Sequence, residues 1–223
     1  MAWRIGCSGF YYREWKGIFY PDGLPQKDWF KYYCKHFNTI EINSTFYKMP
    51  TQKSFEKWFS ESPDDFLFTI KAPRLITHYK QFKDCEKLLN DFYSTINECL
   101  KDKLGCVLFQ FPPKFEFTEE RLNLLMANLK PSFRNVIEFR NVSWLSDEIF
   151  DKLGLMNITV SGMSFPSNLP DSIVDNTKTI YYRFHGKPVL YKSEYDLEQY
   201  KISQRRFLKV FVRFTFILTT HGA

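Results

Sequence analysis

Two glutamates, Glu41 and Glu138, lie inside strongly apolar runs of this sequence. A free carboxylate is costly in such surroundings unless it is paired or hydrogen-bonded. One of them could act as a general acid or base while Lys71, Arg140 and Arg183 fix an anionic group of a substrate. Alternatively, these acids and bases only neutralise each other in the interior. We predict that Glu41 and Glu138 are catalytic, and the structural alternative stays open.

His185 follows Arg183 by two residues, so in a strand both side chains share one face. A neutral imidazole near a carboxylate is a proton carrier or a metal ligand in many proteins, although a single histidine is often structural. We include His185 among the catalytic candidates. The remaining histidines show no ligand spacing, and the sequence indicates no metal and no cofactor; they are His36, His78 and His221.

Further polar and aromatic residues lie at or near the ends of apolar runs, where they could contact a ligand. Gly6 and Gly9 flank Ser8 and would let the main chain approach an anion closely, although the segment matches no nucleotide-binding fingerprint. Aromatic rings that follow could stack on a sugar or a base. The predicted ligand-binding residues are Ser8, Tyr12, Trp15, Asn43, Lys71, Gln110, Arg140, Trp144 and Arg183.

Short β-rich runs alternate with longer amphipathic segments along the chain. Eight runs predict strands, at 3–9, 39–43, 66–71, 106–110, 136–140, 158–161, 180–185 and 210–217. Segments with helical spacing lie around 26–36, 52–61, 84–101, 118–130, 145–154 and 194–207. Thr118 and Ser146 stand where helix-capping residues are preferred.

This alternation predicts an α/β fold of parallel strands with right-handed crossovers. A (β/α)₈ TIM-type barrel is the simplest architecture, and a doubly wound open sheet is the alternative. We expect one domain over residues 1–223, since no linker or low-complexity tract divides the chain. In either architecture the carboxyl ends of the strands converge, so the polar residues there are expected to form one site.

The composition is that of an ordinary globular protein, with an excess of aromatic residues that includes 24 Phe. The net charge of +6 slightly favours an anionic partner. The Lys and Arg residues are scattered, which gives a nucleic-acid partner only weak support. Five cysteines without a Cys-x-x-Cys pair predict reduced thiols and a cytoplasmic location. The apolar runs are too short to span a membrane.

The chain resembles the YecE-like family, also called domain of unknown function 72. Matching segments run in order along nearly the whole chain, and they read IGCSGF at 5–10, EINSTFY at 41–47, LFQFPP at 108–113, EFRNVSW at 138–144 and YRFHG at 182–186. The resemblance implies a TIM-type barrel with shared polar residues at the C-terminal mouth, and it supplies no reaction. The last strand departs from the family: its usual Asn pair is missing between Arg213 and Ala223. This puts regular closure of the barrel in question.

We expect an enzyme, a hydrolase or lyase, that uses acid/base and cationic side chains on an anionic or sugar-like substrate. One alternative is a nucleic-acid-binding protein, because the family's likeness to endonuclease IV-type barrels implies DNA binding. In that case Tyr12, Trp15 and Phe46 would stack on bases. The other alternative is a noncatalytic ligand-binding protein. The sequence leaves the substrate and the oligomeric state open.

Overall fold

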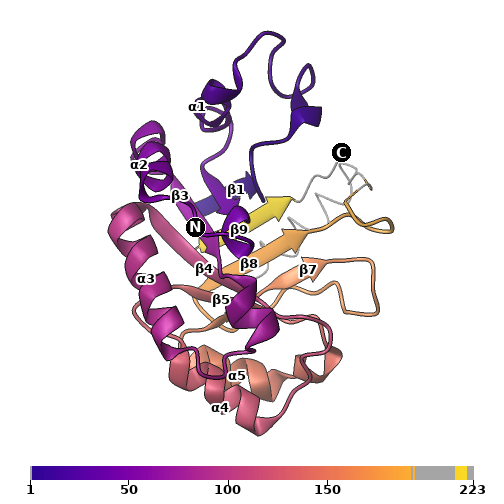
Figure 1. Cartoon of the computed structure of the whole chain (residues 1–223). Helices are drawn as coiled ribbons and strands as arrows, with labels where there is room; N and C mark the ends of the chain where they lie inside the picture. Colours follow the sequence, from indigo (N-terminus) through magenta and orange to yellow (C-terminus); the bar gives the residue numbers. More distant parts are fainter. Residues whose placement is uncertain (1, 192, 194–213, 220–223) are drawn as a thin grey trace.

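The computed structural model describes residues 2–191, 193 and 214–219, and its strands form two parallel sheets (Figure 1). One sheet has the order β1-β9-β8-β7 and the other the order β2-β3-β4-β5-β6. The strands are β1 (Ala2–Cys7), β2 (Thr39–Ile42), β3 (Leu67–Lys71), β4 (Leu104–Gln110), β5 (Asn135–Glu138), β6 (Thr159–Val160), β7 (Gly162–Ser164), β8 (Thr179–Phe184) and β9 (Phe214–Thr219). The α/β fold with parallel strands is confirmed.

The helices are α1 (Trp29–Tyr33), α2 (Gln52–Glu61), α3 (Glu86–Leu100), α4 (Glu119–Asn128) and α5 (Asp147–Leu155). Figure 1 shows α2 to α5 on the outside of the strands. Hydroxyl caps begin three of them: the side chain of Thr118 accepts a hydrogen bond from the amide of Arg121, and Thr51 and Ser146 cap α2 and α5 in the same way. The first predicted helix, 26–36, is shorter than expected, and the one predicted at 194–207 lies outside the described residues.

The sixth predicted strand, 158–161, is split into β6 and β7, which belong to different sheets. Ser161 separates them. Its amide donates to the carbonyl of Ile137 in β5 at 2.8 Å, while β7 pairs with β8. The chain therefore passes from one sheet to the other at this residue, and the predicted boundaries were wrong because the strand continues to Ser164.

The two sheets also meet at β1 and β2, which lie side by side without a main-chain ladder. Side chains bridge these two strands. The hydroxyl of Tyr33 accepts from the amide of Cys7 at 2.7 Å and donates to the carbonyl of Thr39 at 2.9 Å. The side-chain amide of Asn38 makes two further hydrogen bonds to the main chain of β1. Gly6 permits this approach, since a Cβ at that position would lie 2.0 Å from the carbonyl oxygen of Thr39.

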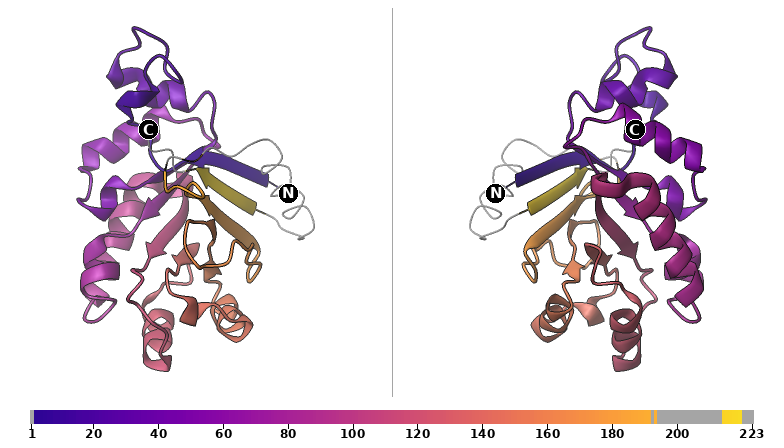
Figure 2. Two further views of the ribbon diagram at one scale, coloured as in Figure 1. Left: turned by 90° about the vertical axis from the view of Figure 1, so that its right-hand side faces the viewer. Right: turned by 90° about the vertical axis from the view of Figure 1, so that its left-hand side faces the viewer.

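The last strand pairs in parallel with β1 on one side and β8 on the other. It therefore takes the position of an eighth barrel strand, although β9 begins four residues later than the predicted run at 210–217. Residues 210–213 lie outside the described part of the chain. The two sheets form a barrel-like arrangement with the helices outside (Figure 2).

Side chains of the strands alternate between two environments, as the period of two requires. Those on the outer face, such as Ile40, Ile42, Phe68 and Ile70, join the main apolar core with the helices. Those on the inner face form a separate small cluster of Cys106, Leu108, Val136 and Tyr181. Gln110, Glu138 and Arg183 each follow one of these residues by two positions, so they lie on the same inner face. The inner face is thus apolar in the middle of the strands and polar at their carboxyl ends.

Candidate functional site

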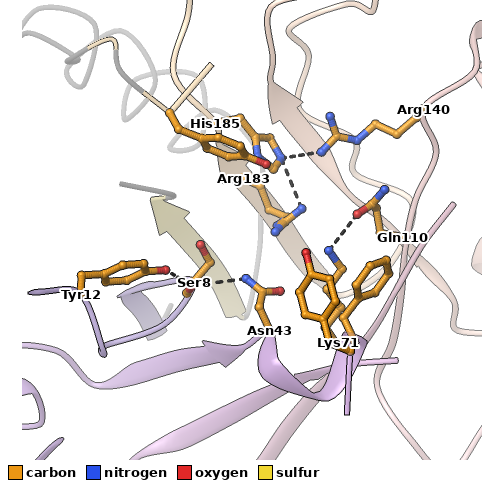
Figure 3. Close-up of a pocket in the computed structure, with 11 residues that line it drawn as sticks. Ser8, Tyr12, Asn43, Lys71, Gln110, Arg140, Arg183 and His185 are labelled. Carbon is orange, nitrogen blue, oxygen red and sulfur yellow. Dashed lines mark hydrogen bonds between the residues drawn. The ribbon is translucent and has the colours of Figure 1, made fainter. Parts of the chain in front are cut away.

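A cavity of about 270 Å³ opens at the carboxyl ends of the strands (Figure 3). Its side chains come from β3, β4 and β8 and from the segments that follow β1, β2, β5 and β8. The lining residues are Ser8, Tyr12, Asn43, Phe46, Tyr47, Lys71, Gln110, Arg140, Arg183, His185 and Tyr191. Distant parts of the sequence therefore meet at one site, as expected of parallel strand ends.

Two fully buried carboxylates lie directly behind the arginines of this cavity. Arg183 joins them: its Nη2 lies 2.7 Å from Glu41 Oε1, and its Nη1 lies 2.7 Å from Glu138 Oε2. The hydroxyl of Tyr181 donates to Glu41 Oε2 at 2.8 Å, and Nε of Arg140 donates to Glu138 Oε1 at 2.6 Å. Every oxygen of the two carboxylates thus accepts a hydrogen bond, which buried charges require.

The charges of this buried cluster stabilise one another. Burial alone would raise the pKa of Glu138, but the neighbouring Arg140 and Arg183 outweigh it and hold that pKa well below its usual range. Burial alone would lower the pKa of Arg183, but Glu138 and Glu41 raise it above the ordinary arginine value. Glu138 and Arg183 are therefore ionised at neutral pH.

His185 is buried and neutral at neutral pH, because burial and the neighbouring Arg183 lower its pKa to about 4. Its Nε2 lies 3.0 Å from Nη2 of Arg140 and 3.3 Å from Nη1 of Arg183. Nε2 also lies 3.3 Å from Oε2 of Glu138, which can only accept. Because both guanidinium groups can only donate and the shortest of the three contacts is to Arg140, we assign Nε2 as the acceptor and place the ring proton on Nδ1. Among the described residues, the buried Nδ1 has no hydrogen-bond partner. It is a donor that a bound ligand could use.

Lys71 differs from the two arginines because its hydrogen-bond partner is a neutral side chain. Its Nζ donates to Oε1 of Gln110 at 2.8 Å and lies 4.4 Å from the centre of the Phe46 ring. Burial, followed by the charge of Arg183, lowers the pKa of Lys71 to about 8. Lys71 can therefore gain or lose a proton close to neutral pH, which is the property of an acid/base group.

The side of the cavity nearest β1 is built on the main-chain carbonyl of Ser8. This oxygen accepts hydrogen bonds from the hydroxyl of Tyr12 at 2.5 Å and from Nδ2 of Asn43 at 3.2 Å. Burial raises the pKa of Tyr12 to about 12, so its hydroxyl keeps its proton. The other side-chain atom, Oδ1 of Asn43, is buried without a partner among the described residues. It is an acceptor that a ligand could use.

The structure brings most of the predicted site residues together. Of the predicted ligand-binding residues, Ser8, Tyr12, Asn43, Lys71, Gln110, Arg140 and Arg183 line the cavity with the predicted catalytic His185. Glu41 and Glu138 do not line it and lie behind the arginines.

Two predicted tryptophans lie elsewhere. Trp144 is fully buried in the core, where its ring stacks 4.2 Å from the ring of Phe139 and its indole N–H donates to the carbonyl of Phe115 at 2.8 Å. The ring of Trp15 packs 4.8 Å from that of Tyr12 and does not reach the cavity. Aromatic character alone therefore could not separate core from site.

Sequence reasoning missed Tyr47, Tyr181 and Tyr191. The period of two could have found Tyr181, because it shares a strand face with Arg183 and His185. Tyr47 and Tyr191 lie in connections after β2 and β8, where no pattern of the sequence indicates side-chain direction.

Within the described ranges, no group of three His, Cys, Asp or Glu residues is placed to hold a metal ion. In the same part of the chain, no helix is both long and apolar enough to cross a membrane. The side chains of the cavity offer cations, hydrogen-bonding amides and hydroxyls, and one lysine whose pKa is lowered to about 8.

Fold and cavity together define an α/β barrel-type protein whose strand ends carry a cationic pocket. The family model described as "Protein of unknown function DUF72" matches residues 4–215. The chain belongs to this family.

Comparisons with known proteins agree with this assignment. UPF0759 protein YunF of Bacillus subtilis is 29% identical over 202 residues, which are 82% of this chain and 70% of that protein. UPF0759 protein YecE of Escherichia coli is 31% identical over 83 residues, which are 37% of this chain and 30% of that protein.

Solved structures support the fold. A DUF72 family protein from Thermotoga maritima superposes with a TM-score of 0.88 at 27% identity, over 99% of this chain and 92% of that one. A fusion protein with a xylose isomerase-like TIM barrel reaches a TM-score of 0.57 at 13% identity, over 100% of this chain and 39% of that one. The second likeness concerns the fold alone.

Proposed function

We propose that the protein is an enzyme that binds a small substrate through an anionic group at the C-terminal cavity. One observation carries the proposal: among the described residues, three cationic side chains line the cavity, namely Lys71, Arg140 and Arg183, and no carboxylate does. Both nearby carboxylates lie behind the arginines, where they fix the guanidinium groups and leave other N–H donors for a ligand. Such preorganised cations favour an anion.

The size of the cavity and its remaining polar groups restrict the class of substrate that can bind. A cavity of about 270 Å³ suits a small molecule rather than a polymer chain. Oδ1 of Asn43 is an unused acceptor and Nδ1 of His185 an unused donor among the described residues. Hydroxyl groups can satisfy both, since each donates one hydrogen bond and accepts others. We therefore favour a hydroxylated acid, such as a sugar acid or a sugar phosphate.

Lys71 is the proposed acid/base group, because its pKa of about 8 lets it exchange a proton near neutral pH. His185 orients the substrate as a neutral donor in this proposal. Glu41 and Glu138 act as positioning residues that hold Arg140 and Arg183. Hydrolases and lyases both use such proton transfer, and the proposal includes both classes.

Titration calorimetry with sulfate tests the anion site, because the charge of sulfate does not change near neutral pH. Lys71→Met should weaken sulfate binding about 10- to 100-fold, the loss of one charge-assisted hydrogen bond. Lys178→Met is the matched control: Lys178 is exposed and precedes β8 at the opposite end of the strand. Equal binding by both variants, or binding of neutral sugars but not of sulfate, would overturn the proposal.

A second candidate, single-stranded nucleic-acid binding, has support at the rim of the cavity. The guanidinium of Arg74 lies 5.6 Å from the ring centre of Tyr47 and 5.4 Å from that of Tyr79. Both rings are largely exposed, and stacked rings beside a cation suit unpaired bases. Fluorescence anisotropy with a labelled single strand should give binding that weakens steeply with salt and is lost in Tyr79→Ala. Salt-insensitive binding would count against it.

A further inference from the structure

We propose that the substrate extends beyond its anionic group into a second, apolar cavity, so that it is an acid with an apolar or aromatic part. This inference rests on the proposed function and specifies the class of substrate. The second cavity measures about 370 Å³. Within the described part of the chain, no charged residue lines it; its lining residues are Ser8, Gly9, Phe10, Tyr11, Tyr12, Ile42, Asn43, Ser44 and Trp58.

The two cavities adjoin, because Ser8, Tyr12 and Asn43 line both of them. The side chains of Tyr12 and Asn43 are tied to the same carbonyl oxygen of Ser8. Figure 3 shows these three residues on the opposite side of the first cavity from Gln110 and Arg140. A ligand whose acid group meets the cations would therefore direct its other end toward this shared wall.

Contacts with neighbouring side chains hold the aromatic rings of the second cavity in place. Trp58 is half-buried in α2, with its ring edge-on to the rings of Phe10 at 6.4 Å and Phe55 at 5.6 Å. Tyr11 stays half-exposed, and its hydroxyl donates to Gln26 at 2.6 Å. A fixed apolar surface of this kind binds an apolar ligand group favourably. Each methylene group that leaves water on binding raises the affinity about fourfold.

The wall between the cavities also carries an unused polar atom. Oδ1 of Asn43 is buried and accepts no hydrogen bond from the described residues, although Nδ2 of the same amide is bound to Ser8. A buried acceptor without a donor is costly, so a ligand hydroxyl or N–H at this point would be favoured. The geometry points to three features in order along the ligand: an acid group, a hydrogen-bond donor and an apolar part.

Calorimetry with methanesulfonate and benzenesulfonate tests the inference, because both are permanent monoanions that differ in the apolar group. Benzenesulfonate should bind at least about tenfold more tightly. Trp58→Ala should bring the ratio of the two affinities close to one. Phe150→Leu is the control, since Phe150 is a partly buried ring of α5 that lines neither cavity, and it should keep the ratio.

Tyr11→Ser provides a second variant if Trp58→Ala fails to fold, because the Tyr11 ring is half-exposed. It should lower the ratio severalfold. Methanesulfonate binding without any gain for benzenesulfonate would overturn this inference alone, as would a gain that survives in both variants. If neither sulfonate binds, the anion site itself is overturned, and this inference with it.

Discussion

The substitution Glu41→Gln tests whether the ion pairs behind the cavity are shielded from water, so that the loss of one charge destabilises the protein. Glu41 is fully buried between Nη2 of Arg183 at 2.7 Å and the hydroxyl of Tyr181 at 2.8 Å. Glutamine has nearly the same shape. Its carbonyl oxygen can face Arg183, and its N–H group can face the Tyr181 oxygen, which is able to accept. The substitution therefore removes the charge with little change in packing.

The expected cost follows from the charge balance of the cluster. Glu41 and Glu138 now balance Arg140 and Arg183, so the variant leaves one buried positive charge in excess. Removing one partner of a buried pair costs about 3–5 kcal/mol of unfolding free energy. Urea denaturation at neutral pH, followed by circular dichroism, measures it.

Asp91→Asn is the matched control, because the ion pair between Lys87 and Asp91 has a similar length of 2.6 Å but exposed side chains, at 87% and 61%. It should cost less than about 1 kcal/mol. The excess positive charge of Glu41→Gln also predicts that sulfate stabilises this variant more than the parent protein. A cost for Glu41→Gln equal to that of Asp91→Asn would refute the reasoning, because the cluster would then be as well solvated as the surface.

Three further predictions concern the site and its framework. Sulfate affinity should fall as the pH rises through about 8, because Lys71 then loses its proton; calorimetry measures this, and Lys71→Met should remove the dependence. Gly6→Ala should lower the melting temperature strongly, since the new Cβ would lie 2.0 Å from the carbonyl oxygen of Thr39, and an unchanged value would contradict the close approach of β1 and β2. Trp144→Ala should lower the free energy of unfolding, measured by urea denaturation, by about 3–5 kcal/mol, because Trp144 lies in the core. Its sulfate affinity should stay unchanged. Weakened binding by the folded variant would show that Trp144 contributes to the site.

Over the described residues, the sequence by itself determined the order of strands and helices, except at the sixth strand, and it determined the convergence of the strand ends. Both follow from local periodicity: residues at a spacing of two share a strand face, and capping residues such as Thr118 and Ser146 begin helices. Lys71, Gln110 and Arg183 could be assigned to one site because parallel strands end at the same edge. These predictions required no knowledge of which strands are neighbours.

Only the tertiary structure decided how deep each side chain lies. Glu41 and Arg183 both belong to the inner face, yet the arginine reaches the cavity and the glutamate lies behind it, because register and barrel packing set their relative depth. The tertiary structure also decided the position of Trp144, which lies in the core. Its segment resembles the family as closely as the segments whose residues build the site, so the resemblance alone did not reveal this. Depth depends on contacts between distant segments, and a pattern along one chain does not contain them. For the same reason, the second cavity appeared only when β1, β2 and α2 were brought together.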